Sequence, residues 1–476
     1  MHCPASPDDP TIMPDVTPSL DFRPELIRRF DVSGPRYTSY PTADRFGPSY
    51  DARAHEQALR QRKPGALSLY VHIPFCETLC YYCGCNKIPT RNHSLSAPYL
   101  DKVEQEMRLV AGMLPQRGAV TQLHWGGGTP TFLDDSETQR LMDFTREHFE
   151  LQPGGEFSIE IDPRKVGARR VEHLARLGFN RMSVGVQDFD PAVQQAVNRI
   201  QSFEETREVI DAARANAFAS VSVDLIYGLP RQNAFNFAAT LEKVLDLRPQ
   251  RIALYSYAHL PARFTPQRRI SEAELPTPEA KLVLLGLAIR RLAHAGYVYI
   301  GMDHFALPDD ELARAQAGGK LHRNFQGYST QADLDLLAFG VSGISKLGRH
   351  YAQNLKTLDA YGAALADGQL PIERGITLDD DDLLRRQAIQ RLMCDFVLDL
   401  PGLAAEHGVD DAQAYFDADL RRLQPLAQAG LLDIDDLVLR VTPQGRLLVR
   451  VIAMQFDRRL HDAAAQLHGA RYSRVI

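Results

Sequence analysis

Between residue 67 and about residue 305, short runs rich in β-branched and aromatic residues alternate with stretches that have helical spacing. Such alternation is typical of parallel strands joined by right-handed crossover helices. It predicts an α/β fold built on a partial (β/α)6 barrel, whose functional side chains come from the carboxyl ends of the strands. The six strands are predicted at residues 67–73, 120–125, 156–162, 180–186, 220–226 and 251–258.

The loop directly after the first predicted strand is rich in cysteine. Cys76, Cys80 and Cys83 form a CxxxCxxC pattern, and Cys85 follows two residues later. Structural zinc requires four ligands, usually from two Cys or His pairs, and no second pair stands at that spacing. Disulfides require an oxidising compartment, yet no signal peptide is recognisable, and a redox CxxC site does not need a third thiol. An iron–sulfur cluster held by three thiolates is favoured, with Cys85 as a neighbouring thiol.

Polar and glycine-rich segments follow the later predicted strands. The run at residues 125–130 contains three glycines, whose N–H groups can approach a ligand closely, although a tight turn is the alternative. Glu160, Gln187 and Asp224 close the next three strands, and Arg199 follows shortly after the fourth strand. A buried polar group without a partner is costly, so these four residues predict a ligand site at the carboxyl edge of the sheet.

The bulk composition limits the partners of this chain. Its 476 residues are 44% hydrophobic and 24% charged, with a formal net charge of −6. This charge gives no general attraction for nucleic acid or anionic membranes, and no apolar run is long enough to span a bilayer. We expect a cytoplasmic protein without a nucleic-acid partner, in which locally placed arginines hold any anionic ligand.

The regions outside the predicted strands suggest further parts. The strap sequence SGPRYTSYPT at residues 33–42 either packs its two tyrosines on the main domain or reaches the active site. Glycine-rich turns between residues 309 and 350 predict a loop that closes over a flat ligand, or simple packing turns. The expected parts are a disordered leader (1–20), an N-terminal strap with a short helix near residues 25–30 (21–60), the barrel (61–365) and a mainly helical, winged-helix-like domain (366–476).

Within the C-terminal part, helical spacing predicts helices at residues 383–396 and 409–429. Residues 430–451 predict a hairpin that turns at Pro443-Gln444-Gly445, followed by another helix. Acidic residues in this hairpin argue against DNA binding. We expect this part to cap the barrel.

Several motifs together resemble known families. CxxxCxxC with Tyr82 before its third cysteine resembles the radical S-adenosylmethionine (SAM) superfamily, in which an open iron of the cluster binds SAM. The wider set is similar to the oxygen-independent coproporphyrinogen III oxidases from Pro24 to the C-terminal part. It comprises SGPRYTSYPT, HIPFCETLCYYCGCNK, HWGGGTPTF, EIDPR, SVGVQDF, DLIYGLP, NFQGY and GVSGIS.

This resemblance implies a reaction. Two propionates of coproporphyrinogen III become vinyl groups, giving protoporphyrinogen IX, with a [4Fe-4S] cluster and two SAM molecules as cofactors. No flavin or nicotinamide motif is present, so a separate protein must donate the electron, and the resemblance implies a monomer. Haem chaperones and haem-degrading enzymes share the radical SAM domain, but the chaperone-like relatives typically lack the fourth cysteine and the strap, both of which this chain has.

The resemblance also implies roles for individual residues. The cluster ligands are Cys76, Cys80 and Cys83. The first SAM meets Tyr70, Gly127, Glu160 and Ile344. The second SAM meets Tyr82, Gly128, Thr129, Gln187, Arg199, Asp224 and Ala258. Phe325 and Gln326 lie on the substrate side.

The substrate carries four propionates, which need basic partners when they leave water. Arg36 in the strap and Arg323 before Phe325 are candidates for this role. Further candidates are Lys87, Arg91 and Arg231.

Overall fold

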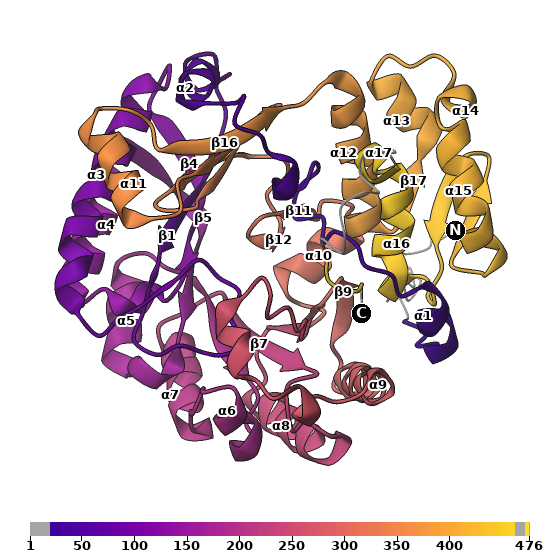
Figure 1. The fold of residues 1–476 in the computed structure, drawn as a ribbon, viewed down its shortest axis with the longest axis horizontal. Coiled ribbons are helices and arrows are strands. Elements are labelled where there is room, and N and C mark those ends of the chain that lie inside the picture. The colour runs from indigo at the N-terminus through magenta and orange to yellow at the C-terminus, as the bar shows by residue number, and fades with distance from the viewer. Residues whose placement is uncertain (1–19, 462–471, 476) are drawn as a thin grey trace, which may run out of the picture.

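The computed structural model describes residues 20–461 and 472–475 (Figure 1). The leader expected at residues 1–20 therefore lies almost wholly outside the described residues. Within them, one twelve-stranded sheet forms the main body, and its seven central strands are parallel. In spatial order these are β13 (Asp335–Phe339), β1 (Leu67–Ile73), β4 (Gly118–Gly127), β5 (Phe149–Ile161), β6 (Arg181–Gln187), β7 (Ser220–Tyr227) and β8 (Arg251–Ser256).

All six predicted strands are confirmed, and β13 is a seventh that was not predicted. Helices connect the parallel strands and cover the outer face of the curved sheet (Figure 1). They are α3 (Ser96–Met113), α4 (Asp135–His148), α5 (Ala168–Arg176), α6 (Pro191–Ala196), α7 (Phe203–Ala215) and α8 (Ala234–Leu247); α9 (Pro278–His294) follows β8.

The two faces of the strands differ in chemistry because side chains alternate along a strand. On β4, Leu123 and Trp125 are fully buried in the main hydrophobic core. Gln122 and His124 alternate with them along the strand and line a cavity on the inner face instead. The inner face is therefore polar, and the barrel encloses a place for a polar ligand.

Antiparallel strands extend both edges of the parallel region. Next to β13 lie β14 (Ile344–Leu347), β15 (His350–Asn354) and β16 (Ile372–Thr377), and next to β8 lie β10 (His304–Ala306) and β9 (Val298–Gly301). A separate hairpin is formed by β11 (His322–Asn324) and β12 (Gly327–Ser329). The segment at 309–350, predicted as a closing loop or packing turns, thus contains α10 (Glu311–Ala317) and four strands.

The C-terminal part combines helices with the three-stranded sheet β17-β19-β18. Its elements are α12 (Asp380–Asp395), β17 (Val397–Asp399), α13 (Leu400–Glu406), α14 (Ala412–Tyr415), α15 (Asp417–Gln428), β18 (Leu432–Asp435), β19 (Val438–Val441) and α16 (Val449–Ala453). The helix predicted at 383–396 is α12, which begins three residues earlier because the Asp379 side chain accepts a hydrogen bond from the Asp382 N–H.

Two predictions for the C-terminal part were wrong in detail. The helix expected at 409–429 is divided into α14 and α15 at Phe416. The hairpin turns at Asp436 and Leu437, both with positive φ, as a two-residue hairpin loop requires. The proline turn at 443–445 instead leads from β19 toward α16, and the Gly445 N–H donates to the Thr442 carbonyl (2.9 Å).

The strap follows the predicted short helix, α1 (Pro24–Phe30), and passes between the barrel and the C-terminal part (Figure 1). Its tyrosines pack on the C-terminal part rather than on the barrel: Tyr37 donates a hydrogen bond to Asp457 (3.0 Å), and Tyr40 is 2% exposed. Arg36 forms an ion pair with Asp303, just before β10. Across residues 20–461 and 472–475, no helix has the length and apolarity needed to cross a bilayer.

Candidate functional site

The cysteine loop leaves the end of β1 and covers the carboxyl ends of the next strands. A short parallel pair, β2 (Phe75–Cys76) with β3 (Ile88–Pro89), fixes its two ends. Beneath it lies a cavity of about 220 Å³, which we call the cluster cavity. Its lining includes Cys76, Cys80, Tyr82, Cys83, Cys85, Gly127, Gly128, Thr129, Glu160, Gln187, Arg199 and Asp224. The predicted residues from six separate segments thus converge on one cavity.

The thiols of this loop have different surroundings. Burial raises the pKa of Cys76 to about 11, and the Thr129 hydroxyl, 3.3 Å from its Sγ, opposes that rise. A hydrogen bond with Cys85 lowers the pKa of Cys83, while the same contact raises the pKa of Cys85 well above its usual value. Cys80 lies 3.6 Å from a guanidinium nitrogen of Arg199.

Two carboxyl groups face one another across the cluster cavity. Glu160 accepts a hydrogen bond from the Gly127 N–H (3.1 Å) and lies 3.4 Å from the His124 ring. Asp224 accepts one from Ser183 (3.0 Å). Burial, followed by the charge of Glu160, raises the pKa of Asp224 to about 7. Near neutral pH this carboxyl can therefore either donate or accept a hydrogen bond.

Arg199 is buried beside the cysteine loop. One of its terminal nitrogens donates to the Gly185 carbonyl (2.6 Å), whereas its Nε has no hydrogen-bond partner in the described part of the chain. Asp162 lies 3.5 Å away and also pairs with Arg164 (2.5 Å). Burial raises the pKa of Asp162, but the charge of Arg199, followed by the hydrogen bond and charge of Arg164, lowers it to about 2 overall. This ion-pair network positions Arg199 at the cavity wall.

The glycine run is required mainly by close packing. A Cβ on Gly128 would lie 2.5 Å from the Pro74 carbonyl oxygen, and Gly127 has a φ of +118°. The Gly128 N–H donates to the Ile73 carbonyl (2.8 Å), so both glycine N–H groups already have partners within the protein. The run therefore holds the cysteine loop against the end of β4.

Some predicted residues lie outside the cluster cavity. Tyr70 shares a hydrogen bond with His72 (3.1 Å) and stacks on His124. Ala258 lies close to Tyr82, because the Gln267 amide donates to the carbonyls of both residues (3.2 and 3.0 Å). Ile344 and Phe325 belong instead to a small hydrophobic cluster with Phe46 and Tyr351.

A second cavity, of about 160 Å³, occupies the polar interior of the barrel and is called the inner cavity here. It shares Glu160, Ser183 and Asp224 with the cluster cavity and also contains Gln326, from the turn of the β11–β12 hairpin. His124, Tyr255 and His304 line it as well and were not predicted. His124 and Tyr255 lie at inward-facing positions of β4 and β8, and the alternation of side chains along these strands could have predicted them.

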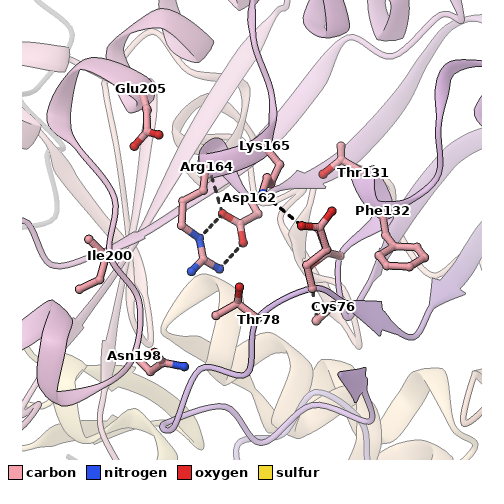
Figure 2. A pocket seen from close by; sticks show the side chains of 12 residues that line it. Cys76, Thr78, Thr131, Phe132, Asp162, Arg164, Lys165, Asn198, Ile200 and Glu205 are labelled. Atoms are coloured by element: carbon pink, nitrogen blue, oxygen red, sulfur yellow. Dashed lines mark hydrogen bonds and ion pairs between the residues drawn. The ribbon is translucent and has the colours of Figure 1, made fainter. Parts of the chain in front are cut away.

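A third cavity, of about 330 Å³, also borders the cysteine loop (Figure 2). Its lining includes Cys76 and Thr78 from the loop, and Asn198 and Ile200 from the segment after α6. Figure 2 shows the Arg164 guanidinium turned toward Asp162, to which its Nε and Nη2 donate hydrogen bonds (2.8 and 2.5 Å). Asn198 fixes the loop by donating to the Leu79 carbonyl (2.8 Å).

The candidate basic residues divide into two groups. Arg231 pairs with Glu274 (2.8 Å) at the surface, Arg91 is exposed, and Lys87 donates to the Cys83 carbonyl (2.9 Å). Arg36 and Arg323 lie deeper, near the inner cavity: Arg36 stands over the ring of Tyr255, which lines it. We therefore consider only these two further as substrate contacts.

The cysteine loop offers three ligands around one cavity. Cys76, Cys80 and Cys83 all line the cluster cavity, and all three are free thiols. Three thiolates around one cavity suit an iron–sulfur cluster.

Comparisons with known proteins agree with this geometry. The family model described as the radical SAM superfamily matches residues 70–244, and that of the HemN C-terminal domain matches residues 378–448. The oxygen-independent coproporphyrinogen III oxidase of Pseudomonas aeruginosa is 49% identical over 456 residues, 95% of this chain and 98% of that protein. Its Escherichia coli counterpart is 48% identical over 457 residues, 96% of this chain and 99% of that protein.

The solved structure of coproporphyrinogen III oxidase (HemN) from Escherichia coli, described as a radical SAM enzyme, superposes with a TM-score of 0.88. It is 47% identical, and the match covers 92% of this chain and 99% of that one. The fold and the cysteine loop thus define a radical SAM enzyme. Within that class, the chain belongs to the family of oxygen-independent coproporphyrinogen III oxidases.

Proposed function

We propose that this chain converts coproporphyrinogen III to protoporphyrinogen IX without oxygen, as a step of haem biosynthesis. Two propionate side chains are oxidatively decarboxylated to vinyl groups. The observation that supports this most is the cluster cavity, where three thiols of one loop face Glu160 and Asp224. Relatives that bear the name of this activity match the chain over nearly its whole length.

We assign the [4Fe-4S] cluster to Cys76, Cys80 and Cys83. A cluster held by these three thiolates would supply the one-electron reduction of SAM that is the radical chemistry of this superfamily. The CxxxCxxC spacing supports Cys83 as the third ligand, and it lines the cluster cavity together with Cys76 and Cys80. Cys85 then remains a neighbouring thiol at the same cavity.

We further propose that two SAM molecules bind. The first is assigned to Tyr70, Gly127, Glu160 and Ile344, and the second to Tyr82, Gly128, Thr129, Gln187, Arg199, Asp224 and Ala258. Arg199 supports the second assignment, because its unpartnered Nε can bind a carboxylate at the cavity wall. Equilibrium dialysis of radiolabelled SAM against the reconstituted protein tests the number directly, and a single equivalent would contradict it.

On the substrate side, Gln326 lies in the inner cavity with both carboxyl groups of the site. Its amide contacts the Ser68 hydroxyl (3.4 Å), which places the hairpin turn over β1. We propose that the substrate enters the inner cavity beside Gln326 and displaces water from Glu160 and Asp224. The polar strand faces then surround the reacting propionate.

We also propose that the enzyme acts as a monomer in the cytoplasm and takes its electron from a separate protein. A reducible cluster with free thiols around it suits a reducing compartment. Light scattering on the reconstituted protein tests the monomer, and a stable dimer would contradict it.

The decisive experiment is an anaerobic turnover assay of the reconstituted protein. Dithionite replaces the electron donor, and SAM and coproporphyrinogen III are supplied. We expect protoporphyrinogen IX, carbon dioxide and 5′-deoxyadenosine, with the last rising when substrate is added. No substrate-dependent rise, together with stoichiometric retention of added haem, would indicate a haem chaperone instead.

A further inference from the structure

The largest of the cavities described here lies away from the cysteine loop. It measures about 420 Å³ and is enclosed by the strap, the β11–β12 hairpin and α12, so we call it the strap cavity. Tyr37 and Tyr40 line it from the strap, Arg323 and Phe325 from the hairpin, and Arg386 from α12. Neither the reaction nor the cofactors account for it.

Arg323 is the unusual residue of this cavity. Arg323 is only 5% exposed, yet its Nε and Nη1 have no hydrogen-bond partner among the described residues. Its guanidinium stands 4.7 Å above the ring of Tyr328, which compensates part of the lost hydration. A guanidinium does not give up its charge when buried, so two unpaired N–H groups indicate a missing acceptor.

The other cations of the cavity already have partners. Lys346 forms an ion pair with Asp333, and Arg391 pairs with Glu406 (2.6 Å). Arg386 donates to the Gly348 carbonyl (2.9 Å). An added anion therefore gains most by binding at Arg323.

The charge around Arg323 is also positive on balance. Arg36 is paired with Asp303, but the buried Arg450 donates to the backbone carbonyls of Pro35 and Val475 (2.9 and 2.8 Å), and no carboxylate is among its hydrogen-bond partners in the described residues. Burial, then the charge of Arg36, lowers the pKa of Arg450 to about 10, and Arg323 adds to this effect. An anion here would relieve the repulsion among these arginines.

The cavity also contains one carboxyl group without a partner. Asp395, in the last turn of α12, has a buried Oδ1 that makes no hydrogen bond to any described residue. Burial raises the pKa of Asp395 to about 6, against the lowering effect of Arg391. Its charge is thus weakened, and it gives Arg323 no hydrogen bond.

We propose that the strap cavity is a carboxylate-binding site in which the ligand pairs with the Arg323 guanidinium. The free Nε and Nη1 belong to different edges of that group, so a carboxylate takes a hydrogen bond from one of them and is held mainly by the positive charge. Phe325 and Tyr351, whose ring centroids are 6.0 Å apart, supply an apolar wall for the carbon chain. Resting on the proposed function, the ligand is a propionate of the tetrapyrrole that is not being decarboxylated.

The hairpin connects this site with the reaction site. Arg323 faces the strap cavity, while Gln326 and Tyr328 of the same hairpin line the inner cavity. A substrate with four propionates, of which two react, can therefore leave one propionate on Arg323 while another is in the inner cavity. Arg323 thereby holds one propionate of the tetrapyrrole while another propionate reacts.

The test compares Arg323→Gln with Arg391→Gln, a control that removes a paired cation from the same cavity. Binding of coproporphyrin III, the stable tetracarboxylate, and of protoporphyrin IX, which has two propionates, is titrated by fluorescence on the reconstituted enzyme. We expect Arg323→Gln to weaken coproporphyrin III binding about tenfold or more, since a charge-assisted pair is lost. Protoporphyrin IX keeps the two propionates that do not react, so its binding should weaken as well, whereas Arg391→Gln should stay within about twofold for both porphyrins.

Cluster absorbance and substrate-independent SAM cleavage should be unchanged in Arg323→Gln, which shows that the protein is folded. If that variant is unstable, Arg323→Lys keeps the charge but loses the fork, and should still weaken binding several-fold. Wild-type affinity for coproporphyrin III in a folded Arg323 variant would overturn the proposal.

A second arm separates this proposal from the proposed function. Tricarballylate, a free tricarboxylate, is tested for thermal stabilisation of the wild type and of Arg323→Gln. If tricarballylate stabilises only the wild type while no porphyrin binds to it, the carboxylate site stands and the tetrapyrrole function fails. If neither porphyrin nor tricarballylate distinguishes Arg323→Gln from the wild type, the site itself is excluded.

Discussion

The cluster cavity and the strap cavity are built in opposite ways. The cluster cavity is formed by the carboxyl ends of neighbouring parallel strands and the loop that follows β1, so each of its parts belongs to a short continuous motif. The strap cavity is enclosed by residues near 40, 323 and 386, which are far apart in the chain and belong to no common sheet. Both cavities contain a buried arginine with unpaired nitrogen, Arg199 and Arg323 respectively.

This difference suggests that the two cavities have different functions. Parallel strands set the positions of the cofactor residues rigidly, because each strand is hydrogen-bonded to two neighbours. The strap and hairpin are held by side-chain contacts such as Tyr37 with Asp457 and Tyr328 with the Met393 carbonyl (2.8 Å). We call the parallel strands around the cluster cavity the first region, and the strap and hairpin around the strap cavity the second region. We infer that the first region fixes the chemistry and that the second region determines which ligand reaches it.

The largest effect expected is on the cysteine loop. Alanine at Cys76, Cys80 or Cys83 should abolish the brown iron–sulfur chromophore and all SAM cleavage, because each removes one of three ligands. Cys85→Ala should keep the chromophore, although the loss of its hydrogen bond should raise the pKa of Cys83. Iron counting and absorbance after anaerobic reconstitution measure both. The ligand assignment would be refuted if Cys85→Ala contained no iron while an alanine variant of Cys76, Cys80 or Cys83 still contained the cluster.

The contrast between the two regions also explains what the sequence could predict. The six parallel strands were found because each contains a short run rich in β-branched and aromatic residues, and the cofactor residues lie at or just after their carboxyl ends. β13 was missed, since its Asp335–Phe339 run stands in a glycine-rich segment and pairs with β1 across more than 260 residues. The hairpin turn was misplaced because Asp436 and Leu437 adopt positive φ without glycine, whereas Pro443 and Gly445 carry the usual turn signal.

The role of the strap depends on contacts that no local pattern reveals. Nothing near Tyr37 in the sequence indicates Asp457, and the partners of Arg450 are carbonyl groups of the strap and of the last residues. The same holds for Arg323, whose unpaired nitrogens are visible only once the cavity is assembled. Long-range side-chain pairing is therefore the part of the site that sequence reasoning could not reach.

The second prediction concerns the strap, which forms one wall of the strap cavity. Removal of residues 1–20 should leave turnover unchanged, whereas removal through Thr42 should abolish decarboxylation. The longer deletion exposes Asp457 and takes the Pro35 and Gly34 carbonyls away from Arg450. The cluster and slow SAM cleavage without substrate should persist, because the strap does not line the cluster cavity. Full turnover after the longer deletion would show that the two regions are not coupled as we infer.

The third prediction tests the rigidity of the first region. Gly128→Ala would bring a Cβ within 2.5 Å of the Pro74 carbonyl oxygen, a backbone atom, so the cysteine loop must shift. We expect destabilisation of about 1–3 kcal/mol, as for overpacking elsewhere, and reduced iron content. Gly112→Ala is the matched control: a Cβ there meets nothing within 4 Å, and alanine favours helix α3 by about 0.5–1 kcal/mol. Equal thermal stability and iron content in both variants would contradict this packing argument.

The last expected effect is on stability alone, and it lies where α3 supports the antiparallel edge beside β13. The buried Glu106 accepts hydrogen bonds from the Gly340 N–H (2.8 Å), the Asn354 amide (2.6 Å) and the Tyr361 hydroxyl (2.6 Å). Burial raises its pKa from 4.5 to about 7, although these hydrogen bonds oppose the shift. Because the folded-state pKa is the higher one, the stabilising contribution is complete below about pH 4.5 and is lost as the pH rises toward 7.

Glu106→Gln should therefore flatten the dependence of stability on pH in this range. Between pH 5 and pH 8 the wild type should lose about 2–3 kcal/mol of unfolding free energy through this group, and the variant should lose correspondingly less. Denaturant unfolding of the two proteins at both pH values measures the difference, with the exposed Glu147→Gln as control. Identical slopes for the wild type and Glu106→Gln would mean that Glu106 is already ionised at pH 5. Its three hydrogen bonds would then outweigh burial, and the edge beside β13 would be held by a charge, as Asp162 holds Arg199 in the first region.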